Sequence, residues 1–186
     1  MLRRTTSGDT LIEVMLAFTI FTMVAVGTFV VMNRGIGITQ QSLELTLVRE
    51  QIDAQAEMLR YVRDTQPTTW QAIKDDAVAN GGDACYTAPR PSGGAFFLRR
   101  TNLPPNNPTQ IQRQVIADTN FRNPTTYSLV NLATGWSYGI WIYAVQAEGS
   151  SSTNPVKAYD MHIHACWDPI GGGPKSSIAT IVRLYD

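Results

Sequence analysis

Glu13 is a carboxylate at the start of a long uncharged stretch, and its position needs a chemical explanation. The twenty residues from Val14 to Asn33 carry no charge and are mostly apolar. A charged side chain at the depth of a lipid bilayer costs several kcal/mol or requires a partner. The position of Glu13 therefore indicates ion pairing in an apolar environment, and we interpret this residue as functional.

The other side chains that could do chemistry are histidines and cysteines. His162 and His164 alternate with Cys166, and alternate residues of a strand can chelate a metal ion. If Cys166 is bonded to Cys85, only two imidazoles remain, so we interpret both histidines as polar residues on a solvated face and predict no metal site. The sequence has no Ser/His/Asp order, phosphate-binding glycine loop or HExxH motif, so we expect neither an enzyme nor a cofactor.

The overall charge gives no case for a nucleic-acid partner. The chain has 186 residues, with 15 Lys and Arg against 15 Asp and Glu. Arg99-Arg100 is the one basic pair after the apolar segment, and we interpret it as a solvated strand end. Three further carboxylates have no spacing typical of a calcium loop and are interpreted as a solvated helix end and loop: Asp75, Asp76 and Asp83.

The two cysteines are predicted to pair if this part of the chain lies outside the membrane. Cys85 and Cys166 are in neither a CxxC motif nor a zinc-like spacing, and exported domains lie in oxidising compartments. The enclosed loop of about 80 residues would give roughly 4–5 kcal/mol of stabilisation in the chain-entropy model. The alternative is two free buried thiols.

Two ordinary explanations of the apolar segment leave residues unexplained. A secretory signal peptide has a short apolar core and then a small-residue cleavage site, but this core is too long and no such site follows Met32. A plain anchor fits better, because this segment as helix spans the ~30 Å of a bilayer core. Arg3 and Arg4 would hold the N-terminus in the cytoplasm. An anchor alone explains neither Glu13 nor the polar leader that ends in Gly8.

The stretch Ser7–Val14, SGDTLIEV, resembles the class III signal of type IV prepilins and pseudopilins. In that family a short basic leader ends in glycine, and a Thr-Leu-Ile-Glu run and a long apolar helix follow. Four consecutive residues match that run at the family's spacing from the leader glycine: Thr10, Leu11, Ile12 and Glu13. The resemblance covers the chain to about Gly35. It implies that a membrane prepilin peptidase removes residues 1–8 by cutting between Gly8 and Asp9, and usually methylates the new N-terminus.

The resemblance also implies a role for Glu13 in assembly. Cleavage would leave a free amine on Asp9, and Glu13 lies one helical turn further along. In a bundle of such helices the amine of one subunit can meet the carboxylate of its neighbour, and the apolar surroundings make an unpaired carboxylate costly. We expect this pair to fix axial register during assembly. For an isolated subunit, the alternative is a carboxylate that reaches the cytoplasmic interface.

The sequence departs from the family at two positions. Asp9 stands where most members have phenylalanine, so cleavage is expected while methylation stays open, and its carboxylate would compete with Glu13 for the terminal amine. Val30 stands where many major pilins have a helix-breaking proline. Gly27 is the interior weak point of this helix. The departures leave major pilin, minor pilin and pseudopilin open.

The helix is expected to run from about Thr10 to about Gln66, because Pro67 is the first proline of the chain. We divide it into an apolar membrane and assembly helix, 9–36, and an amphipathic half, 37–66, with the bend, if any, at Gly35 and Gly37. Six apolar residues recur on one face of the second half: Leu45, Val48, Ile52, Ala56, Leu59 and Val62. The charged residues lie mostly off that face, including Glu44 and the expected i,i+3 pair of Glu57 and Arg60.

Residues 67–186 are expected to form an extracellular head. A short helix over about Thr69–Ala79 would end with a glycine cap at Gly81. Four segments are predicted strands, of which the second is apolar on both faces and the third alternates: Ala95–Arg99, Tyr138–Gln146, Tyr159–Trp167 and Ile178–Leu184. The predicted fold is α+β, the ladle shape of pilins, with a long helix packed against an antiparallel sheet of three or four strands. The loops at 88–94, 102–110 and 147–156 would face partners.

The predicted function is that of a structural subunit of a type IV pilus-like filament. Its partners would be other pilin subunits, the prepilin peptidase, the membrane and an inner-membrane assembly platform. It would be a single-pass precursor in a bacterial cell membrane, with a cytoplasmic N-terminus, and part of an extracellular filament after assembly. Two alternatives stay open: a pseudopilin of a type II secretion or DNA-uptake machine, and a membrane-anchored surface binding module that does not polymerise.

Overall fold

The computed structural model describes residues 9–77, 85, 91, 93–101, 110–124, 126–147, 158–169 and 174–186. The chain separates into two compact units, Met1–Ser42 and Leu43–Asp186. The first unit holds the N-terminal part of a long helix. The second holds the rest of that helix, a second helix and the strands. The α+β class expected from the sequence is confirmed.

Helix α1 (Asp9–Thr65) is unbroken through Gly27, Gly35 and Gly37. In the second unit its predicted apolar face is buried: Val48, Leu59 and Val62 at 0 %, Ile52 at 3 %, Ala56 at 5 %, and Leu45 in part. The expected ion pair between Glu57 and Arg60 is present. The periodicity of apolar residues therefore correctly predicted which side of α1 packs on the head.

Helix α2 (Pro67–Asp75) follows α1 almost at once, so the predicted range Thr69–Ala79 was wrong at both ends. Proline is well placed at the start of a helix, because its fixed φ suits the first turn and its missing N–H is not needed there. The helix ends before Asp76, whose carboxylate pairs with Arg113 of the sheet. The expected glycine cap at Gly81 lies outside the described residues.

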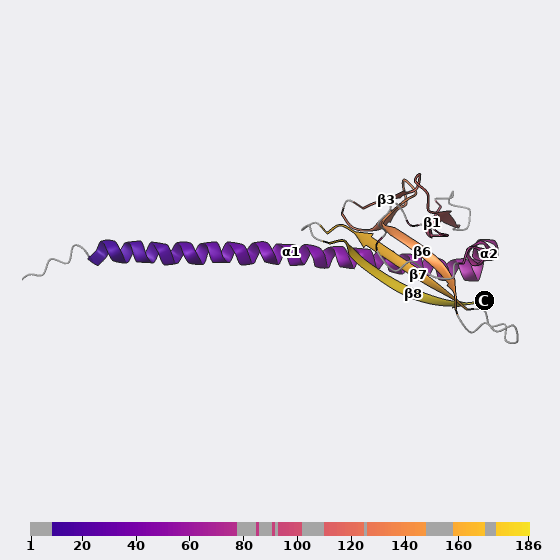
Figure 1. Cartoon of the computed structure of the whole chain (residues 1–186), viewed down its shortest axis with the longest axis horizontal. Helices are drawn as coiled ribbons and strands as arrows, with labels where there is room; N and C mark the ends of the chain where they lie inside the picture. The colour runs from indigo at the N-terminus through magenta and orange to yellow at the C-terminus, as the bar shows by residue number, and fades with distance from the viewer. Residues whose placement is uncertain are drawn as a thin grey trace, which may run out of the picture. The chain divides into compact units, whose positions relative to one another are not determined.

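The main sheet has five strands, and every neighbouring pair is antiparallel (Figure 1). Their order across the sheet is β2 (Ile111–Val115), β1 (Phe96–Arg100), β6 (Ile140–Gln146), β7 (Ala158–Trp167) and β8 (Ser176–Tyr185). Strand β6 is in the middle, as its apolar residues on both faces predicted. One face of the sheet packs with the buried stripe of α1, and Phe96, Ile142 and Met161 belong to this core.

A second, three-stranded sheet corrects the expectation of a single sheet of three or four strands. Its order is β3 (Phe121–Arg122), β5 (Trp136–Tyr138) and β4 (Leu129–Asn131), with β3 parallel to β5. Strand β2 was also missed, because its sequence IQRQV has no run of apolar residues. It pairs residue by residue with β1 over five positions.

Gly139 separates β5 from β6, so the predicted strand Tyr138–Gln146 starts two residues too early. Its φ of +73° is in the region that favours glycine. Its carbonyl accepts a hydrogen bond from the amide of Cys166 at 2.9 Å. A Cβ at this position would overlap the carbonyl oxygen of Cys166 and lie 2.9 Å from Ser128 Oγ, so the close approach of two backbones requires glycine here.

Glutamine side chains attach α1 to the strands through backbone groups. Gln55, only 1 % exposed, donates from Nε2 to the carbonyl of Leu98 and accepts from its amide, both at 2.9 Å. Gln51 accepts a hydrogen bond from the amide of Val130 at 3.2 Å. Since β1 pairs with β6 only at Phe96, the Gln55 amide supplies partners to a strand residue that has none from β6.

Two further contacts join the end of β7 to the rest of the head. Trp167 donates from Nε1 to Glu44 Oε2 at 3.0 Å, and Glu44 is 4 % exposed, so the prediction that Glu44 lies off the buried face was wrong. A buried carboxylate is tolerated where a donor meets it. The adjacent Cys166 forms a disulfide with Cys85, whose Cα lies 5.7 Å away, which confirms the predicted pairing.

Candidate functional site

The predicted cleavage and assembly residues are at the start of α1. Gly8 lies outside the described residues, and the helix begins at Asp9. The residues of the signal motif are therefore helical and their side chains are exposed, with Leu11 at 67 % and Ile12 at 71 %. Glu13 is exposed on the second turn of this helix.

Glu13 has no ion-pair or hydrogen-bond partner among the described residues. The next charged residue along the helix is Arg34, about 30 Å away at 1.5 Å per residue, which is too far for a contact. The only other charged residue within reach along the helix is Asp9, which has the same sign. No charged residue in the described part of α1 can therefore pair with Glu13.

The threonines of the apolar stretch differ from Glu13 in this respect. Each of these threonines, and Thr39 further along the helix, donates to a carbonyl of the preceding turn: Thr19 to Leu16, Thr22 to Thr19, Thr28 to Val24 and Thr39 to Gly35, at 2.8–2.9 Å. Such bonds satisfy a hydroxyl without any outside partner. These hydroxyls can consequently lie in an apolar environment without an unsatisfied donor, whereas the carboxylate of Glu13 cannot.

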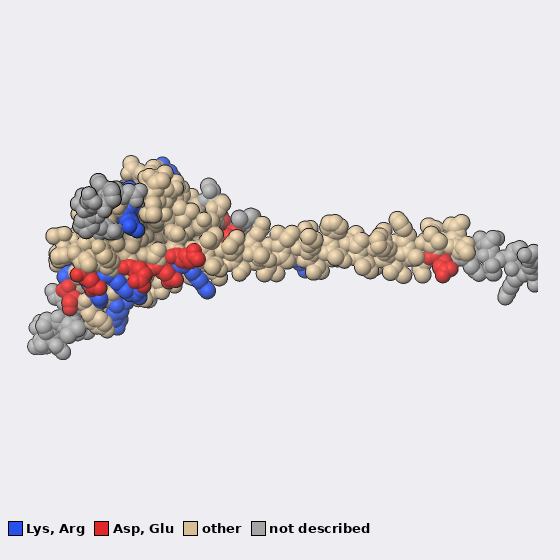
Figure 2. Space-filling view, turned by 180° about the vertical axis from the view of Figure 1, so that it is seen from behind, with Lys and Arg blue, Asp and Glu red and all other residues tan. Residues whose placement is uncertain are grey.

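The apolar side chains of this stretch are uncovered within the described part of the chain. Phe18 is 67 % exposed, Phe21 68 %, Met23 80 % and Phe29 68 %. Figure 2 shows an almost uncharged surface along this half of α1, whereas acidic and basic side chains gather on the second unit. The helix is long and apolar enough to cross a membrane and is a candidate membrane anchor.

The histidine pair of β7 is not a solvated pair. His164 is 5 % exposed and its ring stacks on Trp141, with centroids 5.3 Å apart and planes 7° apart. Trp141 stands directly opposite His164 in the register of β6 and β7, so the cross-strand ring shields it. His162 is partly exposed. No group of three or more metal-ligating side chains is found in the described ranges, and Cys166 is in the disulfide.

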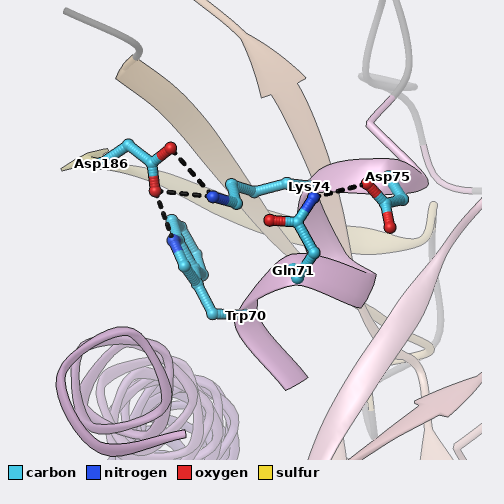
Figure 3. A network of polar contacts seen from close by, with 5 residues as sticks. All are labelled: Trp70, Gln71, Lys74, Asp75 and Asp186. Carbon is cyan, nitrogen blue, oxygen red and sulfur yellow. Dashed lines mark hydrogen bonds and ion pairs between the residues drawn. The ribbon is translucent and has the colours of Figure 1, made fainter. Parts of the chain in front are cut away.

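A polar network ties the last residue of the chain to α2 (Figure 3). Asp186 accepts from Lys74 Nζ at 2.6 and 2.9 Å and from Trp70 Nε1 at 3.2 Å. On the far side of Lys74, Gln71 donates to Asp75 at 2.7 Å. These carboxylates are used by donors of the head itself, so the network is a structural clasp. Asp83, considered above with Asp75 and Asp76 as a possible calcium ligand, lies outside the described residues.

No family model, curated protein or solved structure matches this chain. The assignment of a function consequently depends on the residues and their surroundings.

Proposed function

We propose that this chain is a structural subunit of a type IV pilus-like filament, made as a prepilin and cut after Gly8. The observation that carries the proposal is Glu13: an exposed carboxylate without a described partner on an apolar, uncovered helix. The match of Thr10–Glu13 to the prepilin signal adds to it. In this proposal α1 is stored in the membrane and later packs against copies of itself.

The chemistry of assembly follows from the position of Glu13. Cleavage would convert Asp9 into a terminal residue with a cationic amine, one helical turn before the carboxylate. When helices of several copies pack together, the apolar side chains lose their contact with lipid or water, and Glu13 needs a cation. An amine from a neighbouring copy meets that need only at one stagger of the two helices, so the pair sets the register.

Two features of the head support the proposal that it lies outside the cell and that the helix is divided between head and filament. Its disulfide between Cys85 and Cys166 is of the kind that oxidising compartments maintain. The outer half of α1 is part of the core of the head through Val48, Leu59 and Val62. The amphipathic half of α1 is thereby committed to the head, and the apolar half is left for the membrane or the filament.

The pseudopilin of a secretion or DNA-uptake machine is the second candidate. Asp9 and Val30 keep it open, because Val30 stands where many major pilins have a proline and Asp9 stands where most members of the family have phenylalanine. In that case the same cut and the same pairing would build a short structure, and the length of the fibre separates the two. A surface module that does not polymerise would remain uncut.

The first test is the N-terminus of the mature chain. Intact mass or N-terminal sequencing of the membrane fraction, from cells that contain a prepilin peptidase, should find Asp9 as the first residue. A chain that still begins at Met1 would refute the proposal.

The second test is Glu13→Ala, with Glu50→Ala as the matched control on the exposed side of the same helix. Breaking one partner of a buried ion pair costs about 3–5 kcal/mol, so association should weaken by at least about 100-fold. The variant should remain in the membrane, and the yield of sheared filaments should collapse. Glu50→Ala should assemble normally. Normal filaments from Glu13→Ala would show that the carboxylate has no role in assembly.

A further inference from the structure

Two grooves run along opposite flanks of α1 at residues 53–61, and both lie within the second unit. The first, which we name the Asp53 groove, is lined by Asp53, Ala56, Glu57 and Arg60 of α1 and by residues 180–183 of β8. The second, the Arg100 groove, is lined by Glu57, Met58 and Tyr61 of α1, with Arg100 and Ile111 of the strands. Glu57 lines both grooves, so it marks the ridge between them.

The Asp53 groove carries one unbalanced negative charge. Glu57 pairs with Arg60, and Asp160 pairs with Arg183 through two hydrogen bonds of 2.7 Å. Asp53 is exposed and has no ion-pair or hydrogen-bond partner in the described part of the chain. A ligand of this groove should therefore present one cation.

The Arg100 groove carries the opposite charge. Arg100 is exposed at the end of β1, directly opposite Ile111 of β2 in the strand register. Among the described residues it too has no ion-pair or hydrogen-bond partner, and the nearby Glu57 is used by Arg60. One flank of the helix thus offers a free carboxylate and the other a free guanidinium.

Each groove also exposes apolar surface beside its charge. Ile181 in the Asp53 groove is 59 % exposed, and Tyr61 in the Arg100 groove is 38 % exposed. A ring that meets an aliphatic side chain, with an ion pair next to it, is a usual composition for a protein interface. The two surfaces are therefore complementary in charge and alike in apolar content.

The two edges of the main sheet differ in whether another group covers their backbone. At the β2 edge, the side-chain amide of Gln66 lies against both backbone groups of Ile111, and turning this amide by 180° gives hydrogen bonds of 2.8 and 3.0 Å to them. At the other edge, β8 is ten residues long, has no proline and pairs only with β7 in the described sheet. A long unprotected edge is a site where another chain can dock. Residues 180–183 of this edge strand form one wall of the Asp53 groove.

We propose that the Asp53 groove of one copy receives the Arg100 groove of the next copy in the filament, with Asp53 paired to Arg100 and Tyr61 packed near Ile181. This inference depends on the proposed function, in which all α1 helices point the same way. Parallel copies placed side by side bring opposite flanks of α1 together. The contact is then heterologous, so it does not close on itself and extends from copy to copy.

Charge reversal tests the pairing in the full chain. Asp53→Arg and Arg100→Asp should each lower the ratio of sheared filament to membrane-bound subunit by at least about threefold, because each places like charges opposite one another. The double variant should recover most of the loss. Glu50→Arg, on the exposed side of α1 but outside both grooves, is the control and should assemble as wild type. Reversals that leave the filament yield unchanged, or a double variant no better than either single one, would overturn the proposed contact.

Cysteine cross-linking gives a second readout that does not depend on the yield. A chain with both Asp53→Cys and Arg100→Cys should form a ladder of dimers, trimers and longer species on mild oxidation, whereas each single variant should stay monomeric. Dimers from Asp53→Cys alone would indicate a twofold arrangement through β8 and would refute the heterologous contact. A failure of the proposed function looks different, because the wild-type chain would then keep Met1 or form no filaments.

Discussion

Replacing Gln55 by alanine should destabilise the head more than any exposed substitution on α1. The side chain is 1 % exposed and holds the amide and carbonyl of Leu98, both at 2.9 Å. Its loss leaves two buried backbone groups without partners, and each costs about 1–3 kcal/mol, which sums to about 2–6 kcal/mol. Since domains are stable by only about 5–15 kcal/mol, this loss is easily measured.

Gln55→Leu separates the hydrogen bonds from the volume. Leucine fills most of the space but bonds neither group of Leu98, so it should lose nearly as much stability as alanine. Gln55→Glu keeps an acceptor for the amide but sets a second oxygen against the carbonyl. It should therefore be less stable at pH 7 than at pH 4, where a proton can restore the missing donor.

The assay is urea unfolding of the processed chain in detergent, combined with hydrogen exchange at the amide of Leu98. The protection of this amide should fall in the alanine and leucine variants and fall least in Gln55→Glu, which keeps an acceptor for it. Gln71→Ala, which removes one hydrogen bond from an exposed glutamine of α2, is the control and should change stability by less than about 0.5 kcal/mol. A Gln55→Leu chain within about 1 kcal/mol of wild type, with the Leu98 amide still protected, would refute the reasoning.

Two further predictions concern the head. The hydrogen bond from Arg183 lowers the pKa of Asp160. The pair therefore stabilises the folded chain above the ordinary aspartate pKa of about 4, and this stabilisation is lost as the pH falls through the pKa of the folded state. Unfolding curves of wild type and Asp160→Asn should differ at pH 7 and converge below about pH 4. Gly139→Ala should cost more than Gly93→Ala, because both have a φ of +73° but only at Gly139 would the new Cβ strike the backbone of Cys166. Equal melting temperatures for the two alanine variants would contradict the steric argument.

The parts of the fold that depend on apolar periodicity were predictable from the sequence. Val48, Ile52 and Leu59 repeat with the helical period, and burial follows that period. The alternation in Tyr159–Trp167 likewise predicted a strand, and the structure places β7 there with its odd-numbered residues buried. The strand is one-sided only in its first part, because His164 and Cys166 are buried as well.

The parts that depend on individual polar contacts were not predictable. Glu44 and Gln55 look like surface residues of an amphipathic helix, and each is buried because one particular donor or strand lies opposite. His164 has the place of a solvated residue in the alternation and is covered by Trp141. Of the candidate site, the sequence predicted Glu13 through its apolar neighbours. Arg100 was interpreted only as part of a solvated strand end and Asp53 was not singled out, because only the structure shows the grooves on the two flanks of α1.

The attachment of α1 to the strands through glutamine amides has a consequence for how the assembly responds to ionic strength. Amide hydrogen bonds such as those of Gln55 and Gln51 carry no net charge, and they should hold equally well in dilute and concentrated salt. The proposed contact between Asp53 and Arg100 is an exposed ion pair, and the Debye length falls from about 10 Å at 0.1 M to about 3 Å at 1 M salt. Concentrated salt should therefore loosen the lateral association of the heads while each head stays folded.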